Sequence, residues 1–397
     1  MNKLFTFLSL TAIVACSIKE NKNAPTPTIN YLSSPAQSPS GEPYLFTDEK
    51  GTTYLSWIEK SESQSIFKYS TLTEAQWSEP IIIAFGNNWF VNWADYPMIA
   101  TNGKEFVAHY LNKSGESTYA YDVKLTSSKD GKIWNESVVL HDDGKQAEHG
   151  FVSIVPYEEN FFVTWLDGRN TVMEGMNHHE GHHGEMSVRA AILDQEGKKI
   201  NEWELDKRVC DCCQTSAAIT RNGPVVVYRD RSDEEIRDMS IVRLIDGRWT
   251  EPKSIHPDLW KIAGCPVNGP RVVAHDNNLA IAWFSMPEGK AQVNVIFSAD
   301  AGVTFSKPVR VDEGSGIGRV DVIMLDEGNV MVSWMEGPAI KVAKVNRDGT
   351  KENSMVIASS SDSRSSGFPQ MTKSKNRLIF AWTDDKEKTI KTASLPL

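Results

Sequence analysis

The chain has 397 residues, long enough for two or three average domains or for one large all-β domain. Its content of 40% hydrophobic and 24% charged residues is typical of a globular protein. Because binding to nucleic-acid phosphates requires a basic surface, the formal net charge of −10 excludes nucleic acid as the main partner.

The first residues predict an export signal. Lys3 supplies a positive charge, residues 4–14 form an apolar segment too short to span a bilayer, and a small residue precedes Cys16. This arrangement resembles a bacterial lipoprotein signal, which implies cleavage before Cys16 and a lipid on its sulfur; a secretory signal with an incidental cysteine is the alternative. We expect residues 1–15 to be a signal peptide and residues 16–28 a lipidated tether. This lipid would be the only membrane contact and would hold the protein in the cell envelope.

Residues 29–397 repeat one pattern: an apolar strand, a turn with Gly or Asn, and a second apolar strand that usually ends in an aromatic residue. The units start at residues 41, 95, 150, 215, 269, 318 and 367, which are 49 to 65 residues apart. A third alternating strand, and usually a fourth, follows each pair. Four antiparallel strands repeated at this spacing predict a β-propeller.

We therefore predict an all-β fold with seven blades, or six if one unit is degenerate. The last unit ends after three strands, and we expect its fourth, outer strand to come from residues 29–34. Such closure joins the two ends of the chain and removes open sheet edges. We expect one propeller domain and a monomer.

Two segments carry a turn motif. Residues 298–305 read Ser-Ala-Asp-Ala-Gly-Val-Thr-Phe, and residues 127–134 read Ser-Ser-Lys-Asp-Gly-Lys-Ile-Trp. They resemble the Asp box of the sialidase-like (BNR-repeat) propellers, in which the Asp caps backbone N–H groups and the aromatic residue packs between blades. The resemblance implies an enzyme of anionic glycans, either an exo-α-sialidase-like glycosidase or a polysaccharide lyase. The Phe/Tyr-Arg-Ile-Pro motif of sialidases is absent.

Three residues in the loops between the predicted blades are candidates for proton transfer. Asp95 follows a tryptophan-rich segment, and Glu148 and His149 are neighbours in the next loop. In a propeller these loops share one face, so we expect the three residues around one central opening. Carboxyl and imidazole groups act as general acids and bases. The alternative is that each caps a turn or bonds within its own loop.

Four arginines are candidates for holding an acidic group of a ligand: Arg229, Arg231, Arg237 and Arg319. Guanidinium groups bind carboxylate or sulfate through two parallel hydrogen bonds. We expect Arg231 and Arg319 to reach the opening. The alternative is that the arginines pair with nearby carboxylates, such as Glu235, and join neighbouring blades.

The loops between blades also contain Trp89, Asn92 and Asn268, which complete the candidate ligand-binding residues. An indole ring can stack on a sugar, which makes Trp89 a candidate sugar platform. Its alternative role is packing between blades.

Four cysteines remain after Cys16 is set aside: Cys210, Cys212, Cys213 and Cys265. They lie in the loops of neighbouring units, so topology alone brings them near one another. An even count in an exported protein favours disulfides, with partners that cannot be read from the chain. A thiolate site for copper or zinc is the alternative.

The third unit is longer than its neighbours because of an insertion at residues 173–186. It contains His178, His179, His182 and His183 among glycines and methionines. Imidazole with thioether suits copper, and imidazole with carboxylate suits zinc. A solvated insertion with incidental metal affinity is the alternative, and no other cofactor is indicated.

Three functions remain open at this point. The first is an exported enzyme that acts on an anionic glycan. The second is a non-catalytic glycan-binding or scaffold propeller, which needs the same opening but no acid and base. The third is a copper- or zinc-binding exported lipoprotein.

Overall fold

The computed structural model describes residues 28–172 and 184–397. The predicted signal peptide, Cys16 and the histidines His178, His179, His182 and His183 lie outside the described residues. None of the described residues belongs to a helix long and apolar enough to cross a membrane.

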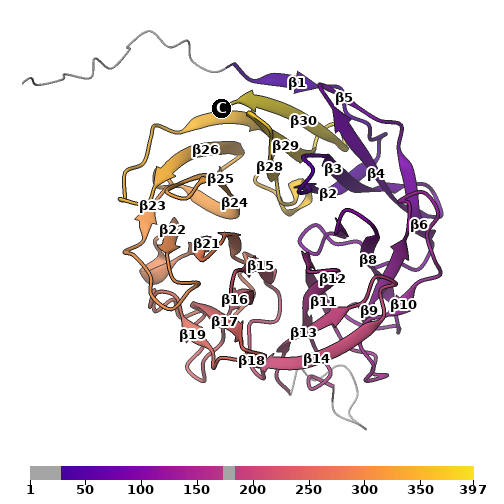
Figure 1. The fold of residues 1–397 in the computed structure, drawn as a ribbon, viewed down its shortest axis with the longest axis horizontal. Helices are drawn as coiled ribbons and strands as arrows, with labels where there is room; N and C mark the ends of the chain where they lie inside the picture. Colours follow the sequence, from indigo (N-terminus) through magenta and orange to yellow (C-terminus); the bar gives the residue numbers. More distant parts are fainter. Residues whose placement is uncertain (1–27, 173–183) are drawn as a thin grey trace, which may run out of the picture.

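Seven antiparallel sheets surround a central axis, so the seven-bladed prediction is confirmed over the six-bladed alternative (Figure 1). In six of the seven sheets the strand that comes first in the chain lies innermost; in the seventh, β1 (Asn30–Leu32) lies outermost and β28 (Gln370–Ser374) innermost. At most junctions the innermost strands of neighbouring sheets contact one another. The last strand of each unit lies at the rim, so the chain must return to the centre to begin the next blade.

Blades 1 to 4 use the first part of the chain. Blade 1 contains β2 (Ser40–Thr47), β3 (Thr53–Lys60), β4 (Ser65–Thr73), β5 (Gln76–Trp77) and β6 (Ile81–Gly86). Blade 2 contains β7 (Ile99–Thr101), β8 (Phe106–Lys113), β9 (Tyr121–Ser128) and β10 (Val138–Val139). Blade 3 contains β11 (His149–Tyr157), β12 (Asn160–Asp167), β13 (Ser187–Leu193) and β14 (Lys199–Asp206). Blade 4 contains β15 (Ser216–Thr220), β16 (Gly223–Arg229), β17 (Met239–Ile245), β18 (Arg248–Trp249) and β19 (Lys253–Ser254).

Blades 5 to 7 complete the ring. Blade 5 contains β20 (Arg271–His275), β21 (Asn278–Ser285), β22 (Gln292–Ser298) and β23 (Val309–Arg310). Blade 6 contains β24 (Gly316–Asp326), β25 (Asn329–Glu336), β26 (Ala339–Asn346) and β27 (Met355–Ser359). Blade 7 contains β28 (Gln370–Ser374), β29 (Arg377–Asp384), β30 (Thr389–Pro396) and β1 (Asn30–Leu32). Two short 3₁₀ helices, η1 (Pro287–Gly289) and η2 (Arg364–Ser366), lie in connections.

The two ends of the chain close the ring as predicted. β1 pairs antiparallel with β30, with Tyr31 opposite Ala393. The hydroxyl of Tyr31 also donates to the backbone carbonyl of Ile357 in blade 6, at 3.2 Å. β1 therefore covers the outer edge of β30, which would otherwise expose unpaired backbone groups.

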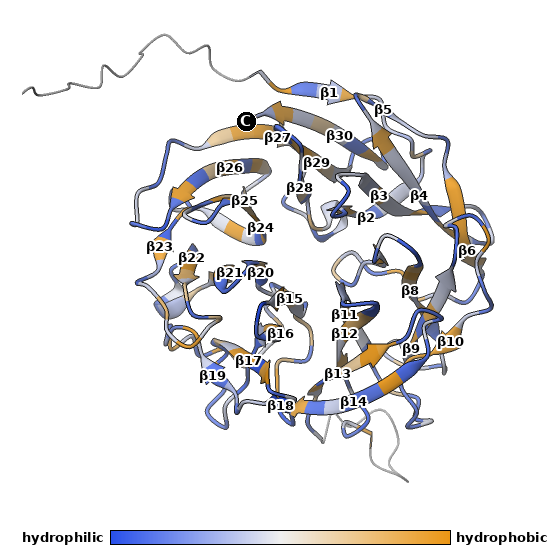
Figure 2. Cartoon of the chain, in the orientation of Figure 1, coloured by the Kyte–Doolittle hydropathy of each residue, from blue (hydrophilic) through white to orange (hydrophobic). Residues whose placement is uncertain are grey.

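Apolar side chains lie mainly on the strands, and hydrophilic residues are concentrated in the connecting loops (Figure 2). The buried apolar clusters join neighbouring blades, because residues of adjacent sheets pack in the same cluster. Period-two alternation accounts for this arrangement, since each inner strand presents alternate residues to the two flanking blades.

In three blades, a buried tryptophan near the end of the second strand donates its indole N–H to a carboxylate two residues later. Alternation places residues i and i+2 on the same side of a strand, so each indole N–H meets its carboxylate. The distances are 2.9, 2.8 and 3.2 Å for Trp57 to Glu59, Trp165 to Asp167 and Trp334 to Glu336. These three carboxylates therefore satisfy buried indoles.

The two Asp-box-like segments form tight turns between the third and fourth strands of their blades. In the first, Asp300 accepts the backbone N–H of Thr304 at 2.8 Å, and the Ser298 hydroxyl accepts that of Gly302 at 2.9 Å. Residues 127–134 use their Ser and Asp in the same way. Both segments stabilise turns and contribute no reactive group.

Removal of β1 should destabilise the ring. A chain that begins at residue 35 should unfold with a free energy lower by at least about 1 kcal/mol, the contribution expected from half-burying one leucine side chain such as Leu32, and should associate through the exposed β30 edge. Thermal unfolding and light scattering check this against a chain that begins at residue 28. Equal stability and an equally monomeric state for both chains would show that β1 does not close the ring.

Candidate functional site

The loops between blades meet at the centre through side chain to backbone hydrogen bonds. Asp95 accepts the backbone N–H of Phe151 at 2.8 Å. Gln214 donates to the carbonyl of Ala94 at 2.6 Å and accepts the backbone N–H of Gly269 at 2.8 Å. The loops that precede blades 2, 3, 4 and 5 are therefore tied together, as propeller topology predicts.

The same chain of contacts continues through the loops that precede blades 6 and 7. Asn268 accepts the backbone N–H of Arg319 at 2.8 Å. The guanidinium of Arg319 donates to the Ser366 hydroxyl at 2.6 Å and to the Gly367 carbonyl at 3.1 Å. Six between-blade loops thus lie side by side, and their shared surface is called the mouth below.

Two carboxyl groups of the mouth are set for proton exchange near neutral pH. Asp95 is 3% exposed, and burial raises its pKa to about 7 even though the Phe151 N–H opposes this shift. Its second oxygen, Oδ2, is buried without a hydrogen-bond partner in the described part of the chain. A Cβ on Gly150 would lie 2.1 Å from this oxygen, so only glycine fits beneath Asp95.

Glu148 is the second carboxyl group. Burial raises its pKa to about 8, and the negative charge of Asp95 adds to this shift. The hydroxyl of Tyr121 donates to Glu148 Oε1 at 2.8 Å. Tyr121 is itself buried and stacked on Phe90 with ring centroids 4.0 Å apart. This packing holds Glu148 in place, and its other oxygen has no hydrogen bond within the described residues.

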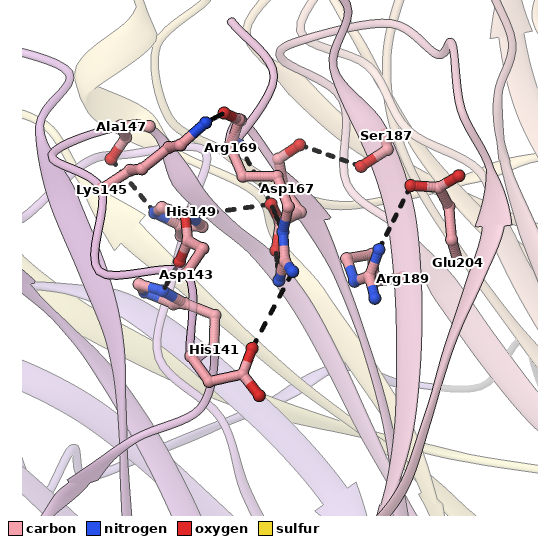
Figure 3. A network of polar contacts seen from close by, with 12 residues as sticks. His141, Asp143, Lys145, Ala147, His149, Asp167, Arg169, Ser187, Arg189 and Glu204 are labelled. Atoms are coloured by element: carbon pink, nitrogen blue, oxygen red, sulfur yellow. Dashed lines mark hydrogen bonds and ion pairs between the residues drawn. The ribbon is translucent and has the colours of Figure 1, made fainter. Parts of the chain in front are cut away.

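His149 does not face the mouth, so the prediction that it transfers protons to a ligand is wrong. Its side chain is 0% exposed. Nδ1 lies 3.2 Å from the carbonyl of Ala147, and Nε2 lies 3.2 Å from Asp143 and 3.7 Å from Asp167 (Figure 3). Both ring nitrogens therefore contact groups inside the protein. Glu148 and His149 are consecutive residues whose side chains point in opposite directions, so His149 points into the protein when Glu148 points toward the mouth.

A histidine that the sequence did not single out, His141, stacks on His149 with ring centroids 3.5 Å apart. Its Nδ1 lies 2.6 Å from Asp143, and its Nε2 lies 3.5 Å from Asp122. Burial lowers the pKa of His141, but the neighbouring carboxylates of Asp122 and Asp143 outweigh it and raise the pKa to about 9. His141 begins the sequence His-Asp-Asp at residues 141–143, and this close grouping of an imidazole with two carboxylates is the signal that could have identified it.

The carboxylates of this network have partners within the protein. Arg169 binds Asp167 through two parallel hydrogen bonds of 2.7 and 2.8 Å, while His141 and His149 flank Asp143 (Figure 3). This arrangement joins blades 2 and 3.

Two of the four predicted arginines are used within the protein and cannot hold a ligand. Arg229 is 1% exposed and donates to the carbonyls of Asn268, Arg237 and Phe284, each at 2.7 Å. Arg319 is also buried, with its guanidinium 5.2 Å above the Trp93 ring and hydrogen-bonded to the loop before blade 7. The expectation for Arg229 and Arg319 was wrong because loop carbonyls occupy their donors.

Arg231 and Arg237 lie at the edge of the mouth and share one partner, Glu235. Arg231 donates to Glu235 Oε1 at 3.0 and 2.8 Å, and its side chain is 23% exposed. Arg237 donates to Glu235 Oε2 at 2.6 Å, and its Nη1 lies 3.1 Å from the sulfur of Cys210. The alternative role, pairing with nearby carboxylates, accounts for both, although only Arg231 reaches solvent.

The remaining candidate ligand residues have structural contacts. Trp89 stacks on Tyr110 with ring centroids 4.2 Å apart, and it lines a small pocket together with Asn92 and Asp95. Asn92 also accepts the backbone N–H of Ala94 at 2.8 Å, which forms a turn. Trp89 therefore packs within the protein, as its alternative role predicts. The pocket that it lines is also lined by Asp95.

Sequence reasoning also missed Arg271, the first residue of β20. Its guanidinium lies 5.5 Å from the Tyr96 ring centroid and donates to the Tyr96 hydroxyl and to Gln370, the latter at 3.2 Å. Arg271 thus joins blade 5 to blades 2 and 7 across the axis. Period-two alternation along β20 predicts the side of the strand to which Arg271 points. The sequence does not identify its partners, Tyr96 and Gln370, because they are distant in the chain.

The disulfide that the even cysteine count predicted is not formed. Cys210, Cys212, Cys213 and Cys265 are all free. The three thiols of the first loop lie within 4.8 Å of one another, and the backbone N–H of Asn268 donates to Cys213 at 3.4 Å. The loops before blades 4 and 5 therefore contact each other, and the three thiols of the first loop form one group without a covalent bond, with Cys265 outside this group.

The sequence matches no protein-family model and no curated protein. Among solved structures, it is similar to the polysaccharide lyase Uly1, with a TM-score of 0.55 and 8% identity over 93% of this chain and 92% of the other. The α-L-arabinofuranosidase Arb93A from Fusarium graminearum gives a TM-score of 0.52 and 9% identity, covering 93% and 97%. The NanB sialidase from Streptococcus pneumoniae gives 0.47 and 11%, covering 87% and 83%.

The fold is a seven-bladed propeller like that of this lyase and this arabinofuranosidase. The lyase and the arabinofuranosidase share it at identities near one residue in ten, so the likeness establishes the architecture and leaves the reaction open.

The stacked histidines predict how stability depends on pH. The folded-state pKa of His141 is raised above its unfolded value, so its stabilisation is complete below about pH 6.5 and is lost as pH rises through about 9. The free energy of unfolding should fall by the order of 3 kcal/mol across this window. His141→Gln should flatten this decline in urea-unfolding curves.

The exposed His275 provides the matched control, because His275→Gln should leave the pH profile unchanged. Parallel profiles for the native chain and His141→Gln would contradict the ion-pair role of His141.

Proposed function

We propose that this propeller is an enzyme that cleaves an anionic glycan at the mouth. The observation that carries the proposal is the neighbouring pair Asp95 and Glu148, whose pKa values are raised to about 7 and about 8. Groups whose pKa values are shifted toward neutrality by burial are concentrated at catalytic sites. The fold shared with a polysaccharide lyase and a glycosidase supports a glycan as the substrate class.

Glu148 is assigned as the proton donor to the departing glycosidic oxygen. With a pKa of about 8, its carboxyl group is mostly protonated at neutral pH, as a general acid must be. The hydrogen bond from Tyr121 fixes the side chain, and the negative charge of Asp95 keeps the proton on it. Asp95 therefore acts as a positioning residue. Hydrolysis and β-elimination both require this protonation of the leaving oxygen.

Arg231 is assigned as the residue that binds the acidic group of the glycan. Its guanidinium is the one of the four predicted arginines that reaches solvent, and it is held by Glu235 and, more loosely, by Asp211 at 3.5 Å. An acidic sugar that displaces Glu235 would keep two parallel hydrogen bonds to Arg231. One partly exposed arginine suits a ligand with a single carboxylate or sulfate group, such as a uronate or a sulfated sugar.

We expect Glu148→Gln to lower kcat by about 10²- to 10⁴-fold, the usual contribution of a general acid. Activity of the native chain should also decline as pH rises through about 8, because the acid then loses its proton. The measurement is product release from a panel of acidic polysaccharides, with reducing ends reporting hydrolysis and ultraviolet absorbance reporting the unsaturated product of elimination.

Glu234→Gln is the matched control, since Glu234 is an exposed glutamate of the loop that carries Arg231. Thermal unfolding of each variant confirms that the fold is retained. Retention of a polysaccharide by the native chain without any product would favour the non-catalytic binding propeller, and full activity of Glu148→Gln would refute its role as the acid.

We also propose that the protein is exported and anchored in the cell envelope by a lipid on Cys16. The charge of Lys3, the apolar residues 4–14 and the small residue before Cys16 support this proposal. Cys16→Ser should abolish incorporation of labelled fatty acid and should release the protein from the membrane fraction. Labelling of the variant equal to that of the native chain would contradict the assignment.

A further inference from the structure

The four cysteines of the propeller take no part in the proposed reaction, yet they form the most concentrated group of soft donor atoms in the described chain. Cys210, Cys212 and Cys213 lie in the loop before blade 4, with their sulfurs within 4.8 Å of one another. The sulfurs of Cys210 and Cys213 are 3.6 Å apart. A disulfide requires about 2.05 Å, so this pair is too far apart to be bonded.

The separation does match a shared metal ion. Zinc–thiolate bonds are about 2.3 Å long, which places two sulfurs of a tetrahedral site about 3.8 Å apart. The structure thus holds two thiols near the edge length of a tetrahedron, with the third thiol in reach of both.

A fourth thiol comes from the neighbouring blade. Cys265 lies in the loop before blade 5, outside the group of three thiols whose sulfurs lie within 4.8 Å of one another. Asn268, three residues later, donates its backbone N–H to the Cys213 sulfur at 3.4 Å. The two loops are therefore in contact, and the exposed Cys265 is the candidate fourth ligand beside the three-thiol group.

The surroundings supply a cation and an N–H donor to two of the sulfurs. Arg237 donates to the Cys210 sulfur at 3.1 Å, and the guanidinium of Arg229 lies in the next layer. Cys210 and Cys213 are each 1% exposed. Buried anionic sulfurs require nearby cations and N–H donors, and metal ligands are oriented by such outer contacts.

We infer that Cys210, Cys212, Cys213 and Cys265 bind one thiophilic d¹⁰ metal ion, Zn²⁺ or Cu⁺. Binding replaces the thiol protons, which go to solvent: four protons are released when four thiols bind Zn²⁺, and three are released when three thiols bind Cu⁺. Either complex carries a net charge of −2, which Arg229 and Arg237 balance. The site joins the loops of blades 4 and 5 at the mouth, and it is independent of the proposed glycan cleavage.

The test uses the purified full-length chain, reduced and then supplied with Zn²⁺ or Cu⁺ alone. We expect one metal ion per chain by elemental analysis and native mass spectrometry, and protection of the cysteine thiols from alkylation. Co²⁺ in place of Zn²⁺ should give sulfur-to-metal charge-transfer absorption. Zn²⁺ loading without Cu⁺ loading assigns the four-thiolate site to zinc, and the reverse result assigns it to copper.

Two variants identify the ligands. Cys213→Ser should lose the metal, and Cys265→Ser should bind it at least about 10-fold more weakly, because the first is a buried ligand and the second comes from the more exposed loop. A variant with His178, His179, His182 and His183 all replaced by Asn should keep one metal ion per chain. Loss of the metal in that variant would place it in the insertion and overturn the inference.

The native chain alone also decides the question if a cysteine variant fails to fold. Alkylation of the cysteines in the presence of either Zn²⁺ or Cu⁺ would overturn the metal site. An intact mass lower by two hydrogens, which indicates a disulfide, in a chain that takes up no metal would also overturn it.

Discussion

The closed ring is the constraint on which the other features depend. Every blade buries its apolar faces against its two neighbours. The seventh blade obtains its outer strand only when β1, from the N-terminal side of the chain, pairs with β30. Because each blade ends at the rim and the next begins at the axis, six between-blade loops must run inward over the same face. Their backbone groups are then satisfied by side chains of neighbouring loops, as in the contacts of Gln214 with Ala94 and Gly269.

This architecture uses most of its charged groups for its own stability. Carboxylates at the ends of second strands accept buried indole N–H groups, and Arg229 and Arg319 bind loop carbonyls. A buried polar group without a partner costs more than a typical hydrogen bond contributes, so these assignments are energetically necessary. The groups that remain for chemistry are few: the Asp95 and Glu148 pair, the partly exposed Arg231, and the thiols.

Glu148 and His149 illustrate how closely function and structure adjoin. The two residues are consecutive, yet Glu148 faces Tyr121 and the mouth while His149 is enclosed with His141, Asp143 and Asp167. The histidine network stabilises the junction of blades 2 and 3, and this rigid junction holds the Glu148 carboxyl in place. The thiols occupy the corresponding loop one blade later, where Arg237 links them to the Arg231 side of the mouth.

The sequence by itself determined the seven-bladed ring, its closure by residues 29–34, and the convergence of Asp95, Glu148 and the cysteines in between-blade loops. These features follow from period-two alternation, the repeat spacing and propeller topology, all of which are written locally in the chain. Only the tertiary structure decided that Arg229 is enclosed while Arg231 is partly exposed, that His149 is buried, and that the thiols of the loop before blade 4 are grouped but not bonded. Burial and hydrogen-bond partners come from residues far apart in the chain, such as Gln214 and Ala94, and no local pattern encodes them.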